Sequence, residues 1–179
     1  MLKATIPAFE DYDPIRNLFI EHKERTLVLE HSLVSLSKWE QEFKKPFLSK
    51  EPKTAGETIA YIKYMTITPN VPDDVFYTLP ATVMRQIDDY IDDPATATTF
   101  KEEKRKGQKE VITSELIYYW MIALGVPFEC QKWHLNRLLT LIRVCGIKNS
   151  PQKKMSRKEL MAQNRALNAA RRKSLGTKG

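Results

Sequence analysis

Carboxylates cluster most tightly at residues 88–93, which read DDYIDD. A DDxxD spacing places carboxylates on one face of a helix, and isoprenoid synthases use that arrangement to hold magnesium and diphosphate. Such enzymes are larger all-helical bundles that carry a second acidic site on a facing helix. This sequence has no second site of that kind. We therefore expect a solvated acidic helix end, which Pro94 terminates.

Cys130 and His134 are four residues apart, so on one helix they would share a face and supply half of a zinc site. Two further ligands are missing, since His22 and His31 lie far upstream. The sequence predicts a packed thiol beside a surface or capped imidazole, and no metal. Cys130 and Cys145 are the two cysteines, and we expect free thiols without a disulfide.

The common motifs of catalysis are absent from the sequence. It contains no P-loop, no glycine-rich dinucleotide turn, no nucleophile elbow and no HExxH pair. An enzyme is therefore the less favoured class, and we predict neither catalytic residues nor a cofactor.

Six aromatic residues sit on or beside predicted amphipathic helices. At such positions aromatic side chains pack in a core more often than they line an exposed binding groove, but both interpretations stay open. The candidate groove residues are Trp39, Phe43, Phe47, Trp120, Phe128 and Trp133.

Positive charge is concentrated in residues 147–179, which hold ten Lys and Arg against one acid, Glu159. The remaining residues hold 19 basic and 21 acidic side chains, so the body is close to neutral. A basic tail without aromatic residues suits phosphate contact or an acidic protein surface, but not sequence-specific nucleic-acid recognition. Candidate docking residues are Arg157, Lys158, Arg165, Arg171, Arg172 and Lys173.

The chain has 179 residues, of which 42% are hydrophobic and 28% charged, as in ordinary globular proteins. We predict a compact, mainly helical domain over residues 1–146 and a basic linker and helical tail over 147–179. Residues 1–7 lack the features of a signal peptide, so we expect no export by that route. The most apolar window, residues 116–128, is too short to span a membrane, so we expect no membrane partner.

The predicted fold class is α+β, mainly α. An N-terminal β-hairpin should pair residues 15–20 with 26–33. Capping boxes at Ser37 and Thr54 predict a helix ending before Pro46 and a second helix behind Thr54. A third helix should run from Pro80 to Pro94.

Two short β-prone runs, 95–100 and 110–112, flank a charged hairpin loop at 101–108. Residues 114–124 and 128–145 should form a buried helical pair, with Gly125 and Gly146 each in the left-handed position after a helix. A capping box at Ser156 predicts a last, thinly apolar helix to Leu175.

Four stretches of the sequence together resemble proteins of long-tailed bacteriophages that are identified as tail assembly chaperones. They are 30–40 (EHSLVSLSKWE) with 45–48 (KPFL); 61–66 (YIKYMT); 118–124 (YYWMIAL) with 128–139 (FECQKWHLNRLL); and 155–160 (MSRKEL) through 175–179 (LGTKG). The resemblance implies a small helical, non-catalytic protein of the host cytoplasm during phage assembly. It implies two partners, the tape measure protein, which it keeps soluble, and the tail tube protein, which it helps to recruit.

Two other classes remain open. The first is a structural component of the virion tail or neck. The second is a nucleic-acid-associated protein that binds non-specifically through residues 147–179.

Overall fold

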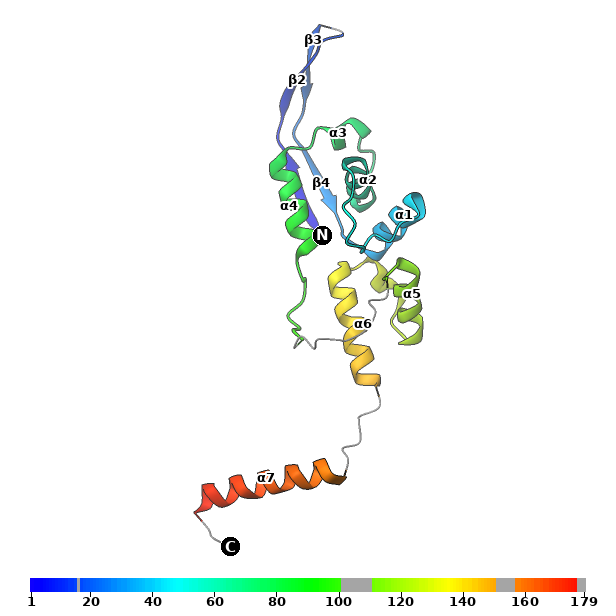
Figure 1. Cartoon of the computed structure of the whole chain (residues 1–179). Coiled ribbons are helices and arrows are strands. Elements are labelled where there is room, and N and C mark those ends of the chain that lie inside the picture. The colour runs from blue at the N-terminus through cyan, green and yellow to red at the C-terminus, as the bar shows by residue number, and fades with distance from the viewer. Residues whose placement is uncertain (16, 101–110, 151–156, 177–179) are drawn as a thin grey trace. The chain divides into compact units, whose positions relative to one another are not determined.

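The computed structural model describes residues 1–15, 17–100, 111–150 and 157–176, in two units, Met1–Lys148 and Asn149–Gly179 (Figure 1). Four short strands and seven α-helices make up most of the described chain, which confirms the α+β, mainly α class. The first unit extends past residue 146, because its last helix continues there. In chain order the elements are β1 (Leu2–Ile6), β2 (Phe9–Asp13), β3 (Leu18–His22), β4 (Arg25–Leu29), α1 (Leu33–Phe43), α2 (Ala55–Met65), α3 (Asp73–Tyr77), α4 (Ala81–Asp92), α5 (Ser114–Ala123), the 3₁₀ helix η1 (Phe128–Lys132), α6 (Leu135–Asn149) and α7 (Arg157–Leu175).

The four strands form two antiparallel pairs, β1 with β4 and β2 with β3. The predicted pairing of residues 15–20 with 26–33 is wrong, because the chain turns earlier, near Asn17, whose φ is +53°. Pairing β4 with β1 places Leu27 opposite Ala4, and both are fully buried. Pro7 has no N–H to donate to a ladder, and the strand pairing is interrupted at this position.

Helix α1 begins earlier than predicted. Ser32, not Ser37, is the N-cap, and its hydroxyl and that of Ser35 each accept from the other residue's backbone N–H, at 3.3 and 3.0 Å. Leu33 and Leu36 are both fully buried, and a helix starting at Ser37 would leave them outside the buried face. The helix ends at Phe43, before Pro46 as predicted.

The next helices agree with the sequence more closely. Thr54 and Glu57 form the predicted capping box of α2, and α4 starts after Pro80 and ends before Pro94. The short α3 was not predicted from the sequence. Residues 95–100 and 111–112 form no strand, so that β prediction is wrong for them, while the loop at 101–108 and residue 110 lie outside the described residues.

The predicted helical pair is half right. Helix α5 is confirmed, and Gly125 after it has a φ of +66°. The second helix is interrupted, because Trp133 is extended and separates η1 from α6. This break lets the N–H of Leu135 donate to the carbonyl of His31 at 2.7 Å. The prediction for Gly146 is wrong, since it lies inside α6.

Apolar side chains from segments far apart in the sequence form the core of the first unit. The largest fully buried ones are Trp39, Leu27, Leu29, Leu33, Leu36, Ile62, Met65, Ile87, Ile117, Met121, Leu135 and Leu138. Among the described residues no helix combines the length and apolar character needed to cross a membrane.

The second unit contains α7, which ends at Leu175 and is followed by Gly176 with a φ of +62°. The described side chains of α7 are exposed, including its larger apolar ones, Leu160, Met161 and Leu167. Ser156, the predicted cap, lies outside the described residues.

Candidate binding surfaces

The first three candidate groove residues, Trp39, Phe43 and Phe47, form one aromatic cluster. The ring of Trp39 lies 4.9 Å from that of Phe43 and 5.1 Å from that of Phe47. Trp39 and Phe47 are only 2% and 8% exposed, and the indole N–H of Trp39 donates to the Glu57 carbonyl at 2.8 Å. Trp39 and Phe47 are therefore core residues, and the groove assignment is wrong for them.

The other three candidates lie on α5 and around η1. Trp120 and Trp133 are partly buried against the core, and the guanidinium of Arg137 covers the Trp133 ring at 4.3 Å. Phe128 is 52% exposed, with its ring 6.4 Å from that of Tyr118. Of the six aromatic candidates, Phe128 is the one that presents most of a ring to solvent.

Two apolar side chains on α5 were missed as surface residues. Tyr119 and Ile122 are 63% and 66% exposed, while Ile117 and Met121 on the opposite face are fully buried. Residues three or four apart on a helix are neighbours, so Tyr119, Ile122 and the exposed Ala123 form one surface. We call Tyr119, Ile122 and Ala123 the α5 surface. The sequence did carry a signal for this surface, because the α5 segment is apolar on nearly every side. A helix that packs on one face needs apolar residues on that face only.

A buried polar cluster joins segments that are distant in the sequence. The rings of His31 and His134 lie 5.2 Å apart, and Nδ1 of His31 is 2.5 Å from the hydroxyl of Tyr61. Nε2 of His134 donates to the carbonyl of Tyr90 at 2.8 Å, and the hydroxyl of Tyr90 donates to Glu30 at 2.7 Å. Burial, and then the proximity of His134, lowers the pKa of His31 to about 3, so this imidazole is neutral at neutral pH.

The structure separates the residues of the possible zinc half-site. Cys130 belongs to η1 and His134 follows the break at Trp133, so the two are not on one helix as the spacing suggested. No group of three or more His, Cys, Asp or Glu within residues 1–15, 17–100, 111–150 and 157–176 could hold a metal ion.

The acidic string lies at the end of α4. Burial, followed by repulsion from Asp92 and Asp89, raises the pKa of the Asp88 carboxyl. These carboxylates therefore repel one another at a helix end, where the negative end of the helix dipole adds to the repulsion.

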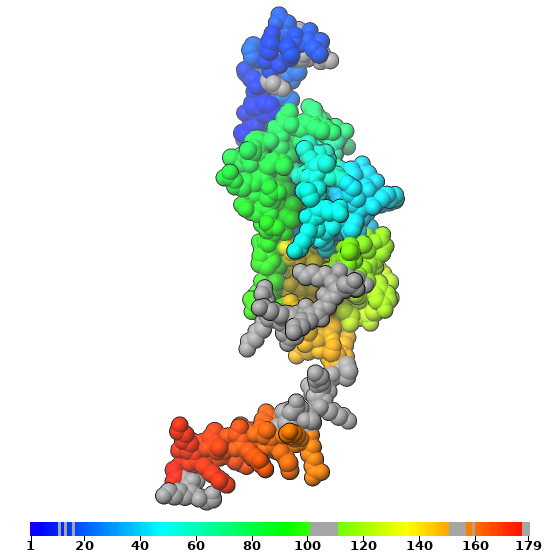
Figure 2. All heavy atoms as spheres, in the orientation of Figure 1, coloured from blue at the N-terminus to red at the C-terminus, as the bar shows by residue number. Residues whose placement is uncertain are grey.

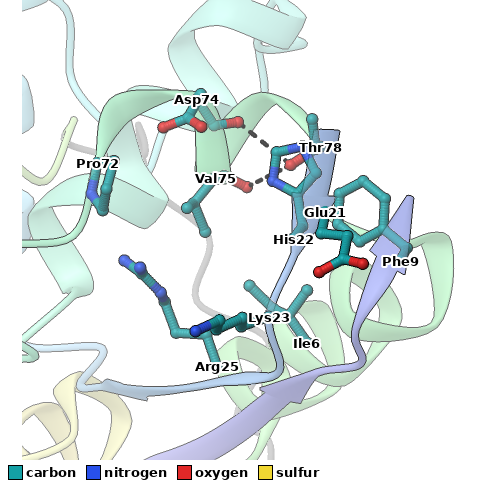
Figure 3. A pocket seen from close by; sticks show the side chains of 10 residues that line it. All are labelled: Ile6, Phe9, Glu21, His22, Lys23, Arg25, Pro72, Asp74, Val75 and Thr78. Carbon is teal, nitrogen blue, oxygen red and sulfur yellow. Dashed lines mark hydrogen bonds between the residues drawn. The ribbon is translucent and has the colours of Figure 1, made fainter. Parts of the chain in front are cut away.

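A pocket of about 250 Å³ lies where the strands meet α3 (Figure 3). Side chains of the strand segment, His22 and Arg25 among them, face Val75 and Thr78 of the helical segment. The hydroxyl of Thr78 is engaged with the carbonyls of Asp74 and Val75, at 3.2 and 3.3 Å. The lining mixes both signs of charge, and no nucleophile paired with a base lies among the lining residues.

Basic residues recur along α7 at a regular spacing. Lys158, Arg165 and Arg172 are seven residues apart, so they form a row along the helix, and all three are exposed. The other tail candidates, Arg157, Arg171 and Lys173, are exposed on the same helix.

Comparisons of this chain with protein-family models, with curated proteins and with solved structures find no match.

Proposed function

We propose that this protein is a non-catalytic phage tail assembly chaperone, which acts in the host cytoplasm by binding apolar helical segments of the tape measure protein. The partner is the one implied by the resemblance of residues 30–40 with 45–48, 61–66, 118–124 with 128–139, and 155–160 through 175–179 to such chaperones. The observation that carries the proposal is the exposed apolar α5 surface on a helix whose opposite face is fixed in the core.

Helix α5 is a firm platform for such binding. Its inner face is anchored by Ile117 and Met121, and its first turn is held by the side chain of Thr113, which accepts from the N–H of Leu116. An amphipathic partner helix can lay its apolar stripe against Tyr119 and Ile122. Aromatic and aliphatic anchors of this kind carry most of the binding energy in protein interfaces.

Co-expression tests the proposal directly. The tape measure protein should be soluble with this chain and aggregate without it, and the double variant Y119D/I122D should lose this effect because it charges the α5 surface. Ile67→Asp is the matched control, since Ile67 is also an exposed apolar residue, at 51%, but lies outside that surface. Equal solubility of the tape measure protein with and without this chain would refute the proposal.

A structural component of the virion tail or neck is the alternative. Such a component is present in stoichiometric copies in purified particles, whereas an assembly chaperone is absent from them. Mass spectrometry of mature particles separates the two.

The exposed basic row on α7 favours one further candidate, non-specific binding to nucleic-acid phosphates. Each phosphate neutralised by Lys158, Arg165 or Arg172 releases counterions, so affinity should fall steeply as salt is raised. Binding to duplex DNA should disappear when the chain is truncated after Lys148. Absent or salt-insensitive binding removes this candidate and leaves the chaperone proposal untouched.

A further inference from the structure

The β2–β3 ribbon extends beyond α3 and α4 of the first unit (Figures 1 and 2). Among the described residues, each of its strands pairs with the other and with no third strand, so each has an open edge. A two-stranded ribbon alone is marginally stable in water, and open edges are templates for pairing with another chain.

The two open edges differ in chemistry. Strand β2 (FEDYD) has three acidic residues among five, and charge of this kind protects an edge against pairing. Strand β3 (LFIEH) begins with three apolar residues and has one acid, Glu21. Leu18 and Phe19 on β3 are 45% and 68% exposed. The edge of β3 is therefore the unprotected one.

We propose that β3 is a dimerisation edge, at which two copies of this chain pair their β3 strands antiparallel around Ile20. The product is a four-stranded sheet in the order β2, β3, partner β3, partner β2, with the acidic strands outermost. Pairing of this kind uses the same surface on both copies and closes at two chains.

The residue register explains why the occupant is a second copy. With Ile20 on the twofold axis, Leu18 lies opposite the partner's His22 and Phe19 lies opposite the partner's Glu21, so no two carboxylates face each other. Three of the five residues of β2 (FEDYD) are acidic, so pairing two β2 strands would bring like charges together, which is destabilising. Only the β3 edge is compatible with itself.

A matched pair of variants tests the edge. Tyr12 and Phe19 are directly opposite in the ribbon, with their rings 5.2 Å apart, so Phe19→Glu and Tyr12→Glu lose the same aromatic contact. Phe19→Glu adds a carboxylate two residues from Glu21, and Tyr12→Glu adds one two residues from Glu10. Only Phe19→Glu places that carboxylate opposite the partner's Glu21.

The measurement is sedimentation of the full chain from micromolar to millimolar concentration, because an interface of two short strands should be weak. We expect dimers for the unchanged chain and for Tyr12→Glu, and at least a tenfold weaker dimer for Phe19→Glu. The double variant F19E/E21K should recover dimerisation, since opposite charges then face each other across the axis.

Cross-linking checks the register independently of stability. Opposed residues in an antiparallel pair have Cα atoms about 5 Å apart, which suits a disulfide. Under oxidation Ile20→Cys should give a covalent dimer and Tyr12→Cys should not. A monomer at all concentrations, or a dimer that Phe19→Glu leaves unchanged, overturns the proposal.

Discussion

The carboxylate of Glu40 on α1 accepts a hydrogen bond, at 2.7 Å, from the backbone N–H of Ser114, the first residue of α5. Its other oxygen accepts from the N–H of Phe47 at 2.8 Å. The side chain is 8% exposed, and its negative charge lies at the positive end of the α5 dipole. One residue thus fixes the helix that carries the α5 surface to the aromatic cluster of α1.

Replacing Glu40 should therefore destabilise the first unit. Glu40→Ala leaves two buried N–H groups without their acceptor, and we expect a loss of roughly 2–4 kcal/mol in the free energy of unfolding, measured by urea denaturation. Glu42→Ala is the control on the same helix, because Glu42 accepts from the Tyr64 hydroxyl in an exposed contact and should cost about 0.5 kcal/mol. Equal losses for the two variants would contradict the role given to Glu40.

Two glycines should respond in opposite directions to alanine. Gly125 has a φ of +66°, so Gly125→Ala should destabilise by about 1 kcal/mol through backbone strain. Gly146 lies inside α6 and an added Cβ would have nothing within 4 Å, so Gly146→Ala should stabilise by up to about 1 kcal/mol. Thermal unfolding of both variants measures the difference, and a stabilising Gly125→Ala would show that α5 does not end in this conformation.

Stability should depend on pH through His31. Its pKa is 6.5 in the unfolded chain and about 3 in the fold, because burial disfavours the charged imidazole. Between these values the unfolded state binds the extra proton, so stability is full above pH 6.5 and falls as pH decreases, by roughly 1 kcal/mol per pH unit.

Denaturation at several pH values between 6.5 and about 4 measures this slope. His31→Gln should flatten it even though the variant is less stable overall. Tyr61→Phe is the matched control, because it removes the hydroxyl near Nδ1 but keeps the imidazole buried, and its slope should persist. An unchanged slope in His31→Gln would assign the pH dependence to other groups.

Amide hydrogen exchange should distinguish α7 from the core helices. The described side chains of α7 are exposed, so this helix lacks the tertiary packing that supplies most helical stability in proteins. We expect the amides of α7 to exchange through local fraying, which costs little free energy. Exchange of the amides of α2 and α5 should require openings of higher free energy. Protection of α7 equal to that of α5 in the isolated protein would contradict this expectation.

The sequence by itself determined the elements whose signals are local. The Thr54 and Glu57 capping box, the prolines that bound α4 and the glycine that follows α5 act within a few residues, so their outcome depends little on distant contacts. Net charge likewise separates the basic tail from the near-neutral body before any fold is known.

The features that depend on long-range contacts were decided only by the tertiary structure. The N-cap of α1 is Ser32 and not the predicted Ser37, because Leu33 and Leu36 are buried on this helix. Strand β4 pairs with β1, where Leu27 lies opposite Ala4 in the core. The break before α6 leaves the N–H of Leu135 available to the carbonyl of His31, which is more than a hundred residues away in the sequence. Burial also divided the apolar residues of α5 into core and surface, since composition specifies how much of a helix is apolar but not which side meets a neighbour.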